Sequence, residues 1–96
     1  MMDKVVAQIV SILDAYKGIE EVYLFGSRAA GTASERSDYD IAIRTNGLSD
    51  IEFNLLVLHV QEEVWTLCKI DMLHLNNVDN PELLANVYKG VCLLKV

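Results

Sequence analysis

The sequence predicts one α/β (α+β) domain, in which a mixed sheet of about four strands packs with about three helices. Three observations predict this class. The chain has 96 residues, the length of one domain, and no linker or repeat divides residues 1–96. Its composition, 52% apolar and 23% charged, excludes a disordered chain. Helical and strand-like patterns follow in the order helix, strand, strand, helix, strand, helix, strand.

The first half of the chain predicts one helix and two strands. In residues 3–17 the apolar side chains recur at helical spacing on one side, and Gly18 is expected to end the helix. Residues 21–25 are β-branched and aromatic, which predicts a strand. Residues 26–37 contain no large apolar side chain and predict a loop that opens with one helical turn. Residues 38–44 alternate as a second strand, which places the aspartates on one face.

The second half predicts two helices and two strands. A capping box formed by Ser49 and Glu52 predicts a helix over residues 49–67. Residues 69–75 are expected to form a strand. Residues 81–88, which start with a proline, predict a short helix, and residues 91–96 a last strand.

Charge and cysteine content exclude several classes of protein. The net charge of −6 argues against a direct nucleic-acid binder, which requires a basic surface. No signal peptide or membrane span is expected, so we expect a cytoplasmic protein without a membrane partner. Cys68 and Cys92 have no neighbours at zinc-ligand spacing and are expected to be reduced, buried thiols.

Two aspartates in the second predicted strand point to a cation site. Asp38 and Asp40 lie two residues apart, so their side chains are expected on the same face, about 6–7 Å from each other along the strand. Like charges so close repel each other, and hard oxygen ligands of this kind suit Mg²⁺. The alternative is that Asp38 caps the loop while Asp40 faces solvent.

Two further features favour the cation site. A strand runs directly into Gly26 and Ser27, where a glycine allows close approach of the backbone to a phosphate. Asp71 interrupts an apolar strand, and a carboxylate in that setting requires a reason. Three carboxylates from two strands, facing a phosphate-binding turn, predict a two-metal site for phosphoryl transfer.

These motifs resemble a known family. Gly26-Ser27, ten intervening residues and the pair Asp38 and Asp40 match the signature of the DNA polymerase β-like nucleotidyltransferase superfamily. The longer stretch GSRAAGTASERSDYDIAI resembles its minimal nucleotidyltransferase branch, small antitoxins that pair with HEPN-domain toxins. The ending NPELLANVYKGVCLLKV is similar to the closing helix and strand of that branch. Ala30 departs from it, since many members have an arginine there.

The resemblance implies a role for each motif residue and a palm-like nucleotidyltransferase fold. It implies that Gly26 and Ser27 hold the β- and γ-phosphates of a nucleoside triphosphate. Asp38 and Asp40 would bind two Mg²⁺ ions. Asp71 would bind the catalytic ion and help to orient or deprotonate the attacking hydroxyl.

The resemblance also implies the substrates. ATP would donate AMP to a hydroxyl, expected to be a tyrosine of a HEPN toxin, and the chain would act as an antitoxin. Arg28 is expected either to assist in phosphate binding or to lie in solvent. Two alternatives stay open: a non-catalytic antitoxin that acts by occluding its partner, and a transferase that modifies small molecules.

The helix predicted over residues 49–67 has two apolar sides. One is expected to meet the sheet and comprises Phe53, Leu56, Val57, Val60, Val64 and Leu67. The other side, centred on Leu58 and Trp65, is expected to contact another chain, a homo-oligomer partner included. The alternative is that the first or last helix covers it.

Overall fold

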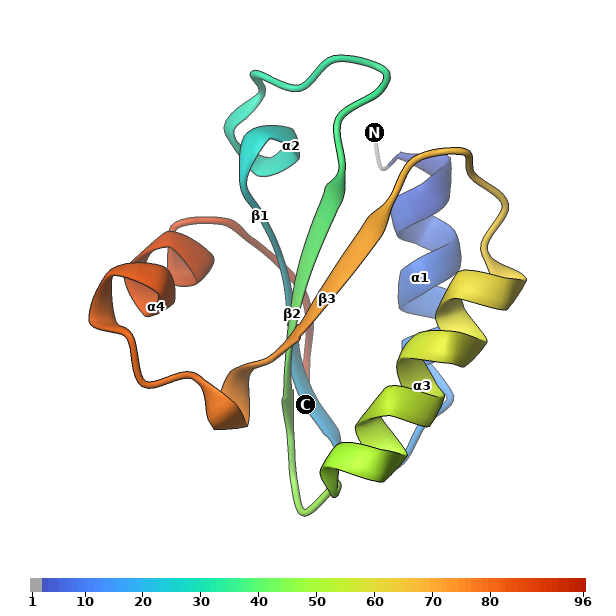
Figure 1. The fold of residues 1–96 in the computed structure, drawn as a ribbon, viewed down its shortest axis with the longest axis vertical. Helices are drawn as coiled ribbons and strands as arrows, with labels where there is room; N and C mark the ends of the chain where they lie inside the picture. Colours follow the sequence, from blue (N-terminus) through green and yellow to red (C-terminus); the bar gives the residue numbers. More distant parts are fainter. Residues whose placement is uncertain (1–2) are drawn as a thin grey trace.

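The computed structural model describes residues 3–96 as a single mixed four-stranded sheet with helices on both faces (Figure 1). The strands are β1 (Ile19–Phe25), β2 (Tyr39–Thr45), β3 (Ile70–His74) and β4 (Val91–Lys95). The helices are α1 (Lys4–Asp14), α2 (Ser27–Ala30), α3 (Asp50–Glu63) and α4 (Pro81–Tyr88), with a 3-10 turn, η1, over Leu75–Asn77. The predicted class and strand number are confirmed; α2 is the helical turn expected at the start of the loop.

The sheet has the strand order β3-β2-β1-β4. β1 pairs antiparallel with both β2 and β4, whereas β2 and β3 are parallel and are joined through α3. The register places Asp40 opposite Phe25 of β1 on one side and opposite Asp71 of β3 on the other. β2, which carries Asp40, therefore lies between β3, which carries Asp71, and β1, which precedes Gly26.

Each face of the sheet has its own core. α1 and α3 cover one face and α4 covers the other (Figure 1). Tyr39, Ile41 and Ile43 of β2 are buried against α1 and α3, while Ala42 is buried with residues of α4. The predicted alternation in β2 is confirmed. Because Asp40 alternates with Ile41, its carboxylate emerges on the α4 face.

Two predicted helices end earlier than expected. α1 ends at Asp14 instead of residue 17, because the amides of Ala15 and Tyr16 bond to carbonyls three residues back and tighten the last turn. α3 ends at Glu63 rather than Leu67. Val64 has an extended backbone, and its side chain turns into the core.

The two sides of α3 differ completely in environment. Phe53, Leu56 and Val60 are buried, as predicted, but Leu67 lies beyond the helix and is fully exposed, so its assignment to the core side was wrong. On the other side Leu58 is 53% and Trp65 83% exposed. Within residues 3–96 neither α1 nor α4 covers this side, which contradicts the alternative of internal cover. We define the apolar face as the exposed apolar residues of α3, Ile51, Leu55 and Leu58, together with Trp65 and Leu67, which follow the helix.

Neither cysteine forms a disulfide. Cys68 is half-buried, whereas Cys92 is exposed, so the prediction of two buried thiols was wrong for Cys92. Cys92 lies in β4, an edge strand in which Val91, Cys92 and Lys95 are exposed and no residue is fully buried. No helix in residues 3–96 has the length and apolar content that a bilayer crossing requires.

The apolar face generates a prediction about association. Replacing Leu58→Ser together with Trp65→Ser removes two exposed apolar side chains that the core does not use, so we expect the thermal unfolding midpoint to stay within a few degrees of the parent. We expect the parent chain to self-associate as its concentration rises, and the double variant to remain monomeric, by sedimentation velocity.

Val91→Thr is a matched control, since Val91 is also exposed but lies on the far edge strand. A parent chain that stays monomeric at every concentration, with a double variant that unfolds, would contradict an interface role for this face.

Candidate active site

The three predicted carboxylates belong to the N-terminal ends of β2 and β3 and to the residue before β2. Asp40 of β2 and Asp71 of β3 are register partners, so their side chains leave the sheet on the same face, about 5 Å apart at the backbone. Asp38 lies one residue before β2, which starts at Tyr39 and not at Asp38 as predicted. Asp38 is exposed, Asp40 half-buried and Asp71 45% exposed. The structure therefore places Asp40 and Asp71 side by side, with Asp38 two residues before Asp40 in the chain.

Asp40 lies where a charged carboxylate is disfavoured. Burial raises the pKa of this carboxyl above its usual range, and the negative charges of Asp71 and Asp38 raise it further. The ammonium group of Lys69 acts in the opposite direction. Lys69 is itself exposed and forms an ion pair with Asp71, at 3.3 Å. One lysine thus offsets part of the charge of three acids.

The donor set suits a hard divalent cation. Carboxylates that are half-exposed leave room for the several waters that Mg²⁺ retains. In residues 3–96, however, no three acidic, histidine or cysteine side chains converge into a complete ligand set. The three residues fit Mg²⁺ by the chemistry of their donor atoms, and Asp40 and Asp71 share one face of the sheet.

Gly26 brings the loop after β1 directly onto Asp40. It has φ +76°, and a Cβ atom at this position would collide with Oδ2 of Asp40. Any larger residue would separate the turn from the carboxylate and strain the backbone. Ser27, which starts α2, therefore directly follows the residue that meets Asp40.

A cleft of about 560 Å³ opens beside this turn. Phe25, Gly26, Ser27, Ala29, Ala30 and Thr32 line one side, and Asn86, Lys89 and Gly90 line the other. The second side comes from the end of α4. Gly90 allows this arrangement, because a Cβ there would collide with the carbonyl oxygen of Leu24 in β1.

The sequence reasoning missed Asn86 and Lys89. A signal for Lys89 was present, since it is the only lysine or arginine between residues 70 and 94, and it directly precedes the glycine that ends the last helix. What the sequence lacked was the antiparallel pairing of β4 with β1, which returns this lysine to the turn at Gly26.

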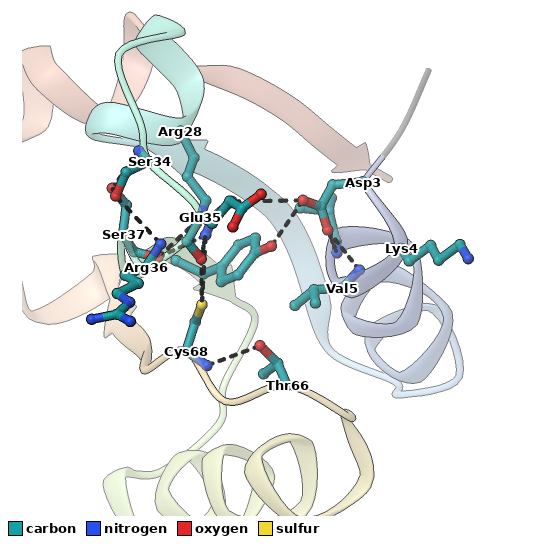
Figure 2. A network of polar contacts seen from close by, with 12 residues as sticks. Asp3, Lys4, Val5, Arg28, Ser34, Glu35, Arg36, Ser37, Thr66 and Cys68 are labelled. Carbon is teal, nitrogen blue, oxygen red and sulfur yellow. Dashed lines mark hydrogen bonds and ion pairs between the residues drawn. The ribbon is translucent and has the colours of Figure 1, made fainter.

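Arg28 lies away from the cleft. Its guanidinium donates hydrogen bonds to the carbonyl oxygen of Ser37, from Nε at 3.0 Å and from Nη2 at 2.9 Å, as Figure 2 shows. It also stacks on the Tyr39 ring, 3.8 Å from the ring centre. Of the predicted site residues, Gly26 and Ser27 line the cleft and none of the three aspartates does. Asp40 meets the turn at Gly26, whereas Arg28 contacts the loop that follows α2.

Comparison with known proteins identifies a family for most of the chain. Residues 7–95 match the family described as polymerase beta, nucleotidyltransferase. Comparison with curated proteins gives no match.

Several solved structures share the fold. One is a toxin–antitoxin crystallised with AMP-PNP, which is 24% identical with a TM-score of 0.74 over 95% of this chain and 73% of the other. Another is a variant of the toxin–antitoxin MntA-HpeT, 24% identical, with a TM-score of 0.73 over 100% and 75% of the two chains. A third, from Sulfolobus solfataricus and assigned as a nucleotidyltransferase, is 19% identical, with a TM-score of 0.59 over 99% and 90%. The predicted nucleotidyltransferase fold is confirmed.

The contact between Gly26 and Asp40 generates a stability prediction. Gly26→Ala is expected to lower the free energy of unfolding by more than about 2 kcal/mol, because the new methyl group meets the carboxylate and the backbone keeps a positive φ. Urea denaturation measures the loss.

Gly47→Ala is the matched control. Gly47 has φ +84°, and beyond its chain neighbours no atom lies within 4 Å of the place that a methyl group would take, so its substitution costs only the backbone strain, about 1 kcal/mol. Equal losses in the two variants would contradict the close approach of Gly26 to Asp40.

Proposed function

The chain belongs to the polymerase beta nucleotidyltransferase family, and from this premise we propose that it transfers AMP from ATP to a hydroxyl group of a partner protein in a Mg²⁺-dependent reaction. The observation that carries the proposal is the shared register of Asp40 and Asp71, on the same face as the Gly26 turn and its cleft. Metal-binding carboxylates beside a turn that can bind phosphate oxygens are an arrangement suited to metal-assisted phosphoryl transfer.

Each residue has a distinct part in the proposed reaction. Asp38, Asp40 and Asp71 would hold two Mg²⁺ ions, which when bound supply positive charge against the triphosphate and the departing pyrophosphate. The backbone amide and hydroxyl of Ser27 bind the β- and γ-phosphates, and Gly26 gives them access. Asp71 orients the acceptor hydroxyl and accepts its proton.

The bond changes are those of a displacement at phosphorus. The acceptor oxygen forms a bond to the α-phosphorus, while the bond from that phosphorus to the oxygen bridging the β-phosphate breaks. Pyrophosphate leaves along the cleft between Ser27 and Lys89, two residues that line its opposite sides. The ammonium group of Lys89 offsets the charge of the leaving group.

A toxin is the proposed partner. Two of the structures similar in fold are toxin–antitoxins, one of them crystallised with AMP-PNP. We extend this role to the present chain, with a tyrosine of a HEPN toxin as the acceptor. The apolar face, which no part of residues 3–96 covers, provides a surface on which such a partner can dock.

Removal of two carboxylates tests catalysis. With labelled ATP, Mg²⁺ and the partner toxin, we expect the parent chain to label the toxin. A variant carrying Asp38→Ala and Asp40→Ala should transfer no detectable label while its circular dichroism stays unchanged, because the ligands are lost and the core is not.

The control replaces two exposed acids outside the site, Asp14→Ala with Asp79→Ala, which changes the net charge equally. Its labelling should equal that of the parent. Occlusion, the second candidate, is distinguished in cells: full protection from the toxin by the variant lacking Asp38 and Asp40 would support it and contradict the enzymatic account.

Lys89 provides a test of the nucleotide position. Among the described residues that line the cleft, Lys89 alone carries a charge, so we expect Lys89→Ala to raise the KM for ATP about tenfold, equivalent to about 1.4 kcal/mol of binding. Steady-state kinetics of label transfer measure it.

The matched control is Lys17→Ala, since Lys17 is exposed and lies outside the cleft. An unchanged KM in the Lys89 variant would place the triphosphate elsewhere.

A further inference from the structure

Arg28 is a largely buried cation whose Nε and Nη2 donate to protein acceptors. Its side chain is only 14% exposed. Besides Ser37, Nη2 lies 3.3 Å from the carbonyl oxygen of Glu35 and 3.6 Å from the sulfur of Cys68. Burial of a guanidinium is costly unless acceptors surround it, and here they do. We propose that Arg28 is a positioning residue that fixes Asp38 in place and does not bind the nucleotide.

One guanidinium holds both neighbours of Asp38 in the chain. On one side it binds the carbonyl oxygen of Ser37 (Figure 2). On the other side it stacks on the ring of Tyr39. Asp38 lies between these two residues. The position of its backbone is therefore set from both sides by a single side chain.

The network extends to the start of α1. The hydroxyl of Tyr39 donates to Oδ2 of Asp3 at 2.8 Å, and Nη1 of Arg28 lies 3.7 Å from the same oxygen. Asp3 in turn accepts a hydrogen bond from the amide of Val5 at 2.7 Å and caps α1. We call Arg28, Asp3, Ser37 and Tyr39 the Arg28 network. It ties α1, α2 and the start of β2 together around the loop.

The loop has few other means of keeping its shape. Residues 31–38 contain no large apolar side chain and include no strand or helix, so packing contributes little order. Apart from the contacts of Arg28, the loop has a short set of bonds among Ser34, Arg36 and Ser37. Thr32 also donates to the carbonyl oxygen of Ser27, and the Cys68 thiol donates to that of Glu35 at 3.1 Å. Asp38 itself is exposed and lies outside β2, unlike Asp40 and Asp71. It is the carboxylate whose position depends most on the loop.

Lysine cannot replace this arginine. A single carbonyl receives two donors of the planar guanidinium, while its flat face rests on an aromatic ring, and an ammonium group provides neither geometry. A phosphate-binding arginine, in contrast, keeps its donors free and tolerates lysine in part. The geometry of the contacts thus separates the two roles, which makes them distinguishable by experiment.

The inference rests on the proposed function only in that Asp38 is taken as a metal ligand. The ordering of residues 31–38 by Arg28 does not depend on that function. Hydrogen–deuterium exchange without nucleotide or metal is the first measurement. In Arg28→Lys we expect amides of residues 31–38 to exchange about tenfold faster than in the parent, with α3 unchanged. Arg36→Lys is the matched control, because the Arg36 side chain is exposed in the same loop and takes no part in the network.

The second measurement is direct binding of Mn²⁺, a probe for the Mg²⁺ site, by electron paramagnetic resonance. In Arg28→Lys we expect about tenfold weaker binding, the size of effect typical for a residue that supports a metal ligand. In the transfer reaction, raised Mg²⁺ should restore the activity of this variant, and the KM for ATP at saturating Mg²⁺ should equal that of the parent.

The opposite results are equally defined. Unchanged exchange in residues 31–38 and unchanged Mn²⁺ binding would overturn the positioning role, and a KM that stays raised at saturating Mg²⁺ would assign Arg28 to the nucleotide instead. A parent chain that binds no Mn²⁺ would contradict the proposed function, while the exchange result would still decide whether Arg28 orders the loop.

A milder variant covers the case in which Arg28→Lys does not fold. Asp3→Ala removes the acceptor of the Tyr39 hydroxyl and the ion pair with Arg28 from an exposed position. We expect it to fold and to speed exchange in residues 31–38 by a smaller factor. Exchange in this loop equal to that of the parent would count against the Arg28 network.

Discussion

The parallel pairing of β2 with β3 is the constraint on which the rest of the site depends. It places Asp40 and Asp71 side by side in one register, where their charges repel and where burial makes ionisation of Asp40 harder. The other features are arranged around this cost. The half-exposed position of Asp71, the ammonium group of Lys69 and the close turn at Gly26 all concern the same two carboxylates. In another register Asp40 and Asp71 would not be neighbours, and these features would not act on a pair of carboxylates.

The positions of Asp40 and Asp71 on strands and the turn at Gly26 could be predicted because they follow from local sequence patterns. Alternation along β2 fixed which side Asp40 would face, and the β1 sequence ending in Gly26-Ser27 located the turn. Lys89 and the environment of Arg28 were not predictable in this way. Lys89 reaches the cleft through pairing of the last strand with the first, and Arg28 meets Ser37, Tyr39 and Asp3, contacts that depend on tertiary structure. The predicted end of α3 was wrong for a similar reason, since the backbone of Val64 is extended and its side chain is buried in the core.

Two kinds of support act on the carboxylates. Asp40 and Asp71 are held by the backbone hydrogen bonds of the sheet, which are cooperative and insensitive to single side chains. Asp38 is held through neighbours in a polar loop. In a chain of 96 residues with a limited core, such polar contacts order segments that apolar packing does not reach. The site thus combines a rigid pair with a third group whose order has a separate origin.

The exposure of Trp65 has a practical consequence. The chain contains a single tryptophan, and its indole is 83% exposed on the apolar face, just beyond the end of α3. Indole fluorescence moves to shorter wavelength when water is replaced by apolar surroundings. The protein therefore carries an intrinsic optical reporter at one defined spot, so that any molecule covering this region is detectable in the emission spectrum without an attached dye.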